Sequence, residues 1–229
     1  MAKTKMKIFT IIKEESKRIP NKNFIDVRGY PLWWHLLSEL DGLDITVNTD
    51  SPKFLKQLVN SGLKSIQVIE RDQKYIDWEN DESLDSSPVE DMLFDFCETI
   101  DRSEIVVLTH VTSPFLKKET IFDAINVLNN DQSANSIHSV SQVQDFTWLI
   151  KDNKANPINF FTDRVQRTQD LSLILISKGA FFIAKAGDIL DQRKRLPEPL
   201  IFYPLNHTQS IEIDNFEDLE FARLLKGRI

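Results

Sequence analysis

A basic loop follows the first predicted strand and could bind phosphate. Residues 13–23 read Lys-Glu-Glu-Ser-Lys-Arg-Ile-Pro-Asn-Lys-Asn and supply ammonium, guanidinium, hydroxyl and amide donors suited to phosphate oxygens. The whole chain has a net charge of −7, so this local positive charge indicates an anionic ligand. A solvated surface loop would have the same composition, and charge and position alone support the two interpretations about equally.

The chemistry of this loop must come from side chains. Neither Gly-x4-Gly-Lys-Ser/Thr nor Gly-x-Gly-x-x-Gly occurs, and the chain has only six glycines. A backbone cradle of the kind that glycine-rich loops form around phosphates is therefore not expected.

Two carboxylates near the end of the sequence could hold a metal ion. Glu212 and Asp214 alternate with isoleucines, which predicts a strand over 210–214 with both carboxylates on one face. Such a pair suits Mg²⁺, which completes its shell with water and substrate phosphates. Asp214 also precedes a predicted helix over 216–226, with Glu217 three residues on, and spacing alone favours this helix-capping role.

A further polar segment, His-Val-Thr-Ser-Pro at 110–114, follows a buried-looking strand. At the end of a strand its side chains would face a crevice and suit a hydroxylated ligand. Thr112 or Ser113 could instead only cap a turn before Pro114. The other histidines lack the spacing of metal ligands and are interpreted as structural or surface residues.

Strands and helices alternate through the first part of the chain. Strands are predicted at 7–12, 44–48, 65–69 and 104–109, and helices at 31–41, 51–60, 88–100 and 118–129. This alternation predicts an α/β fold with a mostly parallel sheet. Ligands of such sheets bind beyond the carboxyl ends of the strands, where loops 13–28, 49–53 and 110–117 lie.

The second half is richer in strands. Strands are predicted at 135–143 and 179–184, with a short helix at 186–191 before the last helix. Residues 144–167 are polar yet carry Phe146, Trp148, Phe160 and Phe161, which indicates an excursion from the sheet that could form a dimer contact.

Composition sets the broad class. A chain of 229 residues that is 41% hydrophobic and 28% charged is expected to form one globular domain over 1–229. No apolar stretch is long enough to span a bilayer, and a cytoplasmic location is expected. The acidic net charge argues against nucleic acid as a partner. The single cysteine, Cys97, has the apolar neighbours of a core residue.

Several ordered strings carry a family resemblance. They are Ser-Lys-Arg-Ile-Pro-Asn-Lys-Asn at 16–23, Val-Asn-Thr-Asp-Ser at 47–51, 110–114, Arg-Thr-Gln-Asp-Leu at 167–171, Gly-Ala-Phe-Phe at 179–182 and Ile-Glu-Ile-Asp at 211–214. Together they resemble the acylneuraminate cytidylyltransferase family, also called CMP-sialic acid synthetases, over nearly the whole chain.

The resemblance implies a Rossmann-like nucleotide-diphospho-sugar transferase fold and a homodimer. It also implies transfer of CMP from CTP to the anomeric hydroxyl of an acidic nonulosonate-type sugar, with Mg²⁺. Lys22 and Asp214 would be catalytic, and Asp214 with Glu212 would bind the metal. The implied nucleotide ligands are Lys13, Ser16, Lys17, Lys22, Asn23 and Arg71. The implied sugar ligands are His110, Thr112, Ser113, Gln169 and Phe182.

The chain departs from the family pattern at several positions. Lys13-Glu14-Glu15 replaces the usual Arg-x-Gly, His110 replaces glutamine, and Thr168 replaces arginine. Loss of the glycine changes the backbone freedom expected of the loop. The alternatives that these departures leave open are another sugar, another nucleotide, and a non-catalytic role in binding a nucleotide or a partner protein.

Overall fold

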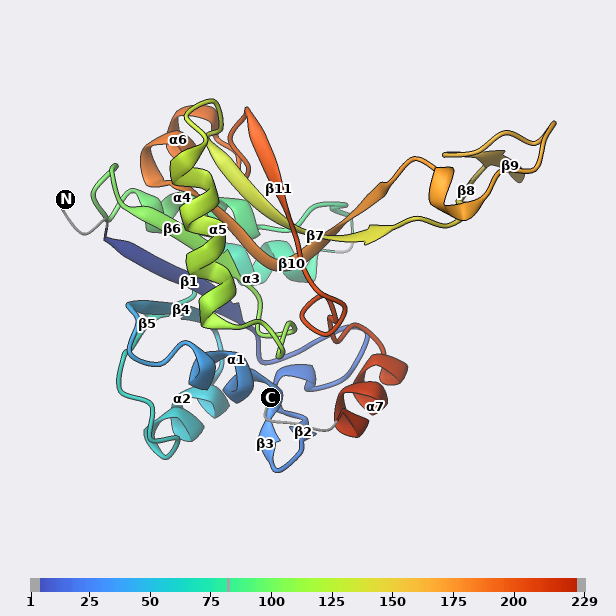
Figure 1. The fold of residues 1–229 in the computed structure, drawn as a ribbon. Coiled ribbons are helices and arrows are strands. Elements are labelled where there is room, and N and C mark those ends of the chain that lie inside the picture. The colour runs from blue at the N-terminus through green and yellow to red at the C-terminus, as the bar shows by residue number, and fades with distance from the viewer. Residues whose placement is uncertain (1–4, 82, 226–229) are drawn as a thin grey trace.

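A seven-stranded sheet organises the chain (Figure 1). The computed structural model describes residues 5–81 and 83–225. The strands follow the order β11-β7-β10-β6-β1-β4-β5. They are β1 (Met6–Ile12), β4 (Ile45–Thr49), β5 (Ile66–Glu70), β6 (Ile105–Thr109), β7 (Ser136–Val143), β10 (Ile174–Lys185) and β11 (Leu200–Pro204). Only β10 runs antiparallel to its neighbours β6 and β7, so the predicted α/β class with a mostly parallel sheet is confirmed.

Helices cover both faces of this sheet. The helices α1 (Leu32–Glu39), α2 (Pro52–Val59) and α5 (Lys118–Asn130) contribute to one apolar cluster, together with Ile8 and Ile12 of β1. The other face packs Phe9 and Ile11 against α3 (Gln73–Asn80), α4 (Val89–Cys97) and α6 (Ala186–Gln192). Successive residues of a strand point to opposite faces of the sheet, which is why the short apolar strand β1 contributes side chains to both cores. Cys97 lies in the second core as expected, and burial raises the pKa of its thiol to about 12.

A third apolar cluster joins the basic loop to the end of the chain. Ile19 of the loop is fully buried against Ile213 and against Leu219 of α7 (Phe216–Leu224). The short turn η1 (Lys22–Phe24) and the two-stranded ribbon of β2 (Asp26–Val27) and β3 (Tyr30–Pro31) complete this region. Packing of Ile19 therefore brings the loop and the segment around residue 213 together.

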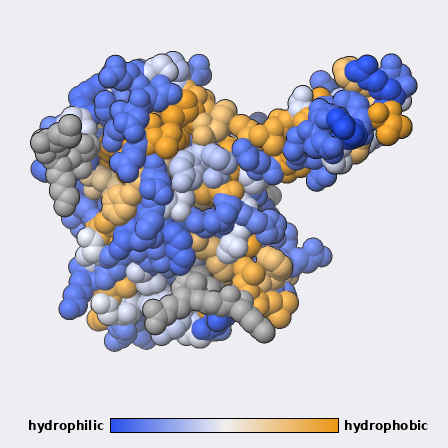
Figure 2. All heavy atoms as spheres, in the orientation of Figure 1, coloured by the Kyte–Doolittle hydropathy of each residue, from blue (hydrophilic) through white to orange (hydrophobic). Residues whose placement is uncertain are grey.

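An arm projects from the body of the molecule (Figure 1). The long strands β7 and β10 lead out to the antiparallel pair β8 (Trp148–Lys151) and β9 (Lys154–Pro157), and η2 (Thr168–Asp170) lies on the return path. Apolar side chains are exposed along it (Figure 2), Trp148 and Ile150 among them. Residues 144–167, which were expected to leave the sheet, contain the separate two-stranded sheet of β8 and β9, and the role of this arm in a dimer stays a prediction.

Some elements differ from the sequence prediction. The polar stretch 70–87 contains α3, and β11 was not predicted. Residues 210–214 form no strand; the pairing there is a single hydrogen bond of 2.8 Å from the Ile213 amide to the Thr112 carbonyl. The last helix ends at Leu224, and Lys226 lies outside the described residues. Within the described ranges, no helix combines the length and apolar character needed to cross a membrane.

Candidate active site

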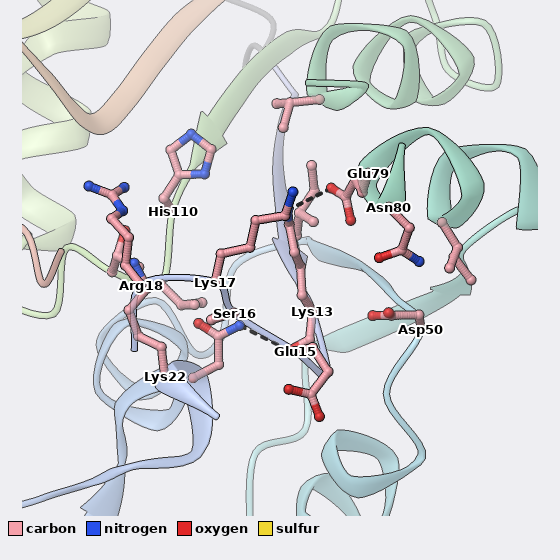
Figure 3. Close-up of a pocket in the computed structure, with 16 residues that line it drawn as sticks. Lys13, Glu15, Ser16, Lys17, Arg18, Lys22, Asp50, Glu79, Asn80 and His110 are labelled. Carbon is pink, nitrogen blue, oxygen red and sulfur yellow. Dashed lines mark hydrogen bonds and ion pairs between the residues drawn. The ribbon is translucent and has the colours of Figure 1, made fainter. Parts of the chain in front are cut away.

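A cavity of about 520 Å³ opens where β1, β4 and β6 end, at the edge of the sheet that the alternation of elements predicts. Its walls are formed by Ile11, Lys13, Glu15, Ser16, Lys17, Arg18, Lys22, Asn23, Asp50, Ile76, Glu79, Asn80, Val89, His110, Val111 and Thr112. Asp50, Glu79 and Asn80 lie on one side of the cavity, and Arg18 and His110 lie on the other (Figure 3).

The basic loop holds its shape without glycine. The Asn23 amide donates a 3.1 Å hydrogen bond to the carbonyl of Lys13 and so closes the loop, while Asn21 adopts a left-handed conformation with a φ of 55°. Glu15 is not among the described residues with positive φ, so this position does not require the glycine that other sequences carry. The Glu14 carboxylate turns away to the hydroxyl of Ser51, which caps α2.

Lys22 is the most firmly placed cation of the cavity. Its ammonium donates to the carbonyl of Ile213 at 2.9 Å and to the carboxylate of Asp214 at 3.2 Å. Arg18 also reaches Asp214, at 2.9 Å. One carboxylate thus faces two cations that point into the same cavity, an arrangement suited to a phosphate group with a bound cation.

Arg71 is buried behind the opposite wall. Its side chain is fully buried and donates to Asn48 at 3.1 Å and to Glu79 at 2.8 Å. Glu79 in turn lies 2.8 Å from the ammonium of Lys13. Arg71 therefore fixes the carboxylate of Glu79, and Glu79 is the residue of this pair that lines the cavity.

His110, Gly179 and Glu212 form a close group beside the cavity. The Gly179 amide donates to the Glu212 carboxylate at 2.7 Å. A Cβ atom on Gly179 would lie 2.5 Å from Glu212 Oε1 and 3.1 Å from His110 Cδ2. Burial lowers the pKa of His110 to about 4, helped by the charges of Arg195 and Lys22, so the ring is neutral near pH 7. Burial also raises the pKa of the Glu212 carboxyl above its ordinary value, against the opposing effect of the Gly179 amide.

The structure corrects the capping role considered for Asp214. Asn215 is the residue that caps α7, and its side chain and that of Asp218 form the reciprocal capping box. The cap lies one residue further on than spacing suggested. The Asp214 carboxylate is therefore available to Lys22 and Arg18.

The structure gathers most of the predicted site residues and leaves a few outside. The residues Lys13, Ser16, Lys17, Lys22, Asn23, His110 and Thr112 line the cavity. Phe182 contacts His110 edge to face at 6.1 Å between ring centroids. Ser113 is fully buried, and Gln169 lies in η2 on the arm, where its carbonyl accepts from Gln144 at 3.2 Å.

Residues 14–159, more than half of the chain, match the family model described as cytidylyltransferase. The chain belongs to the cytidylyltransferase family. The N-acylneuraminate cytidylyltransferase of Streptococcus agalactiae serotype III (strain NEM316) is 27% identical over 89% of this chain, and the chain spans about half, 49%, of that relative. The CMP-N,N'-diacetyllegionaminic acid synthase of Legionella pneumophila (strain Philadelphia 1) is 29% identical, with 91% of each protein covered.

A solved structure of another protein has the same fold as this chain. The structure of CMP:2-keto-3-deoxy-manno-octonic acid synthetase complexed with CTP superposes with a TM-score of 0.64, at 15% identity, over 96% of this chain and 97% of the other. The fold of this chain is thus the nucleotide-diphospho-sugar transferase fold.

Sequence reasoning named Arg71 in the polar stretch 70–87 but missed the residues of this stretch that line the cavity. Glu79 and Asn80 line the cavity from the end of α3. The available signal was Asp72, which accepts from the amide of Lys74 and caps α3. Arg195, which stacks on Phe182 at 4.5 Å, was also missed, because no periodicity marks the loop after α6.

The donors present fit a magnesium ion held jointly with a nucleotide. Among residues 5–81 and 83–225 no group of three His, Cys, Asp or Glu side chains is placed to hold a metal alone. Asp214 offers a carboxylate that is 40% exposed, beside two cations suited to phosphate. One or two protein carboxylates plus substrate phosphates are the ordinary ligand set of Mg²⁺.

Proposed function

We propose that this cytidylyltransferase transfers CMP from CTP to the anomeric hydroxyl of an acidic nonulosonate-type sugar and releases pyrophosphate. The observation that carries the proposal is that Lys22 and Arg18, two cations that line one cavity of an acidic chain, both contact the carboxylate of Asp214. Relatives named for two different acidic sugars support the substrate class.

The cationic loop is the proposed triphosphate site. Lys13, Lys17 and Lys22 supply positive charge, and Ser16 and Asn23 supply neutral donors. Lys22 is the proposed catalytic cation, since the carbonyl of Ile213 holds it in place before any ligand arrives.

The nucleoside is proposed to lie toward α3. Arg71 acts there through Glu79, whose carboxylate it orients at 2.8 Å. Asn80 lies beside Glu79 and adds amide donor and acceptor groups suited to a base.

The sugar is proposed to bind at the opposite end, by His110, Thr112 and Phe182. Ser113 is buried and Gln169 lies in η2 on the arm, so neither side chain reaches the proposed sugar site as the chain stands. To reach the sugar, these residues need a conformational change of this chain or must come from a second copy. The anomeric hydroxyl of the sugar attacks the α-phosphorus in line with the bond to the leaving pyrophosphate. As the new P–O bond forms, the bond to pyrophosphate breaks and the hydroxyl proton passes to water. No covalent nucleophile is required.

Asp214, with Glu212 as a second ligand, is the proposed holder of Mg²⁺. When bound there, the ion would neutralise charge on the phosphates. Lys22 and Arg18, which contact Asp214, are the cations proposed to donate hydrogen bonds to the phosphate oxygens of the nucleotide.

The arm is proposed to form a homodimer contact. Its exposed apolar side chains, Trp148, Leu149, Ile150 and Phe161 among them, support this role. Light scattering should give twice the mass of the chain, and Trp148→Glu with Ile150→Lys should return the mass of one copy. Because CTP is a cytoplasmic metabolite, the proposed reaction also supports a cytoplasmic location.

The activity is tested with purified protein, CTP, Mg²⁺ and a panel of sialic, legionaminic, pseudaminic and octulosonic acids. Release of pyrophosphate together with the mass of a CMP-sugar is expected for at least one sugar. Lys22→Met should abolish release, and ATP, GTP and UTP serve as controls for the nucleotide. Absence of turnover across the whole panel, while CTP still binds, would favour a non-catalytic nucleotide-binding role.

A further inference from the structure

Arg195 forms one end of a stack of three side chains beside the cavity. Its guanidinium lies 4.5 Å from the ring centroid of Phe182, and His138 stacks on the same ring at 4.3 Å with an interplanar angle of 18°. His138 is itself fixed by a 3.2 Å contact to the carbonyl of Phe181. The aromatic ring therefore holds the arginine plane in a defined position.

The place of this guanidinium relative to the cavity follows from its neighbours. Phe182 meets His110, which lines the cavity, and the backbone amide of Arg195 donates to Glu90 at 3.4 Å. Val89, the residue before Glu90, also lines the cavity. Arg195 thus lies between β10 and the start of α4, next to the His110 end.

The carboxylate partner of Arg195 lies further away than those of three cations in the basic loop, Lys13, Arg18 and Lys22. Arg195 lies 3.6 Å from Glu90, and both side chains are more than two-fifths exposed, so the pair is weak. Lys22, Arg18 and Lys13 instead have carboxylate partners at 2.8 to 3.2 Å. Lys178, the other cation near this end, faces Glu212 at 3.9 Å.

The chemistry of the proposed substrate favours a cation near the reacting centre. In an α-keto acid sugar the carboxylate is attached to the anomeric carbon, whose hydroxyl attacks the α-phosphorus. The carboxylate must therefore lie beside the reacting centre and not along the triphosphate. A planar guanidinium presents two parallel N–H donors that match the two oxygens of a carboxylate.

We propose that Arg195 binds the carboxylate of the acidic sugar and is the residue that selects acidic over neutral sugars. This role rests on the proposed cytidylyltransferase activity. Phe182 then serves as the platform that orients the guanidinium, in addition to bordering the sugar.

The test compares Arg195→Gln and Arg195→Lys with the control Arg193→Gln. Arg193 also stacks on a phenylalanine, Phe94, at 4.2 Å, and has carboxylates at 3.8 and 3.9 Å, but it faces α4 outside the cavity. Loss of a charge-assisted hydrogen bond should raise the KM for the sugar by about 10- to 100-fold in Arg195→Gln. The KM for CTP should stay unchanged, Arg195→Lys should recover part of the loss, and Arg193→Gln should match the wild type.

A second substrate separates binding from structure. With the methyl ester of the same sugar, which lacks the charge, wild type and Arg195→Gln should have the same kcat/KM. An equal loss for acid and ester, or an unchanged KM for the acid, would overturn the role of Arg195. An inactive wild type would instead overturn the proposed function, so the two failures are distinguishable.

Discussion

The ammonium of Lys22 lies 3.2 Å from the carboxylate of Asp214, although 192 positions separate the two residues in the sequence. Burial of Ile19 and Ile213 in one apolar cluster brings their segments together. Arg18 approaches the same carboxylate at 2.9 Å, so Asp214 balances two cations that would otherwise repel each other. Asp214 is therefore expected to have opposite effects on nucleotide binding and on turnover.

Asp214→Asn should separate these two effects. Without Mg²⁺, CTP should bind at least as tightly as to the wild type, because Lys22 and Arg18 lose their competing partner. With Mg²⁺, turnover should fall on the order of 100-fold, as when one preorganised electrostatic group is removed from a transition state. Calorimetry with CTP and a pyrophosphate assay provide the two measurements. Asp191→Asn, which removes a surface partner of Arg102, is the control, and full turnover in Asp214→Asn would contradict the metal role.

Breaking the ion pair between Arg71 and Glu79 should first of all lower the free energy of unfolding. Arg71→Met removes the buried guanidinium and leaves Glu79 and Asn48 without this partner, which should cost about 3 kcal/mol of unfolding free energy. Adding Glu79→Gln should recover part of that loss, because it removes a carboxylate that has lost its buried partner and keeps only Lys13. Urea unfolding of the wild type, both single variants and the double variant measures the coupling. Additive losses would mean that the pair contributes nothing specific.

The order of elements and the basic loop could be predicted because both leave local signals. Short β-branched strands alternate with amphipathic helices, and Lys17, Arg18 and Lys22 belong to a charge cluster that stands out in an acidic chain. The predicted cavity edge follows from topology alone, since parallel strands end together.

The remaining features depend on contacts between distant segments. Residues 210–214 alternate like a strand, yet Ile213 makes one bond to Thr112 and the segment joins no sheet. Arg71 carries no sequence signal of being fully buried, because its partners Asn48 and Glu79 come from other elements. Arg195 is positioned by stacking on Phe182, a contact that neither spacing nor charge pattern encodes.

His110 should make stability depend on pH. Its pKa is lowered to about 4 in the folded protein, against 6.5 for the unperturbed group, so the unfolded chain binds the proton first as pH falls. Unfolding free energy should therefore decrease between pH 6.5 and pH 4, by about 2 kcal/mol from this residue after allowance for its partial exposure. Burial lowers the pKa of His35 and His138 as well, so they add to the slope in the same direction.

The contribution of His110 is isolated by His110→Gln, which restores the glutamine that the family usually has there. Urea unfolding at pH 7.5 and pH 5 should show a smaller difference in this variant than in the wild type. An unchanged difference would mean that the ring titrates near its ordinary value in the folded state.

Gly179→Ala tests how closely the group beside the cavity is packed. The added Cβ would lie 2.5 Å from Glu212 Oε1 and 3.1 Å from His110 Cδ2, so both side chains must move and the hydrogen bond from the Gly179 amide must lengthen. Loss of that bond should lower the unfolding free energy by about 1 kcal/mol. Displacement of His110 should lower kcat by about 10-fold, because misplacement of a substrate-positioning group by a fraction of an ångström is costly.

The steric cause predicts a rescue. Glu212→Asp shortens the carboxylate side chain by one methylene and makes room for the new Cβ, so Gly179→Ala with Glu212→Asp should be more stable than Gly179→Ala alone. Thermal unfolding and the pyrophosphate assay on both single variants and the double variant measure this recovery. If the double variant loses the sum of the two single effects, the contact between position 179 and Glu212 does not limit the site, and the loss in Gly179→Ala must come from the backbone of β10.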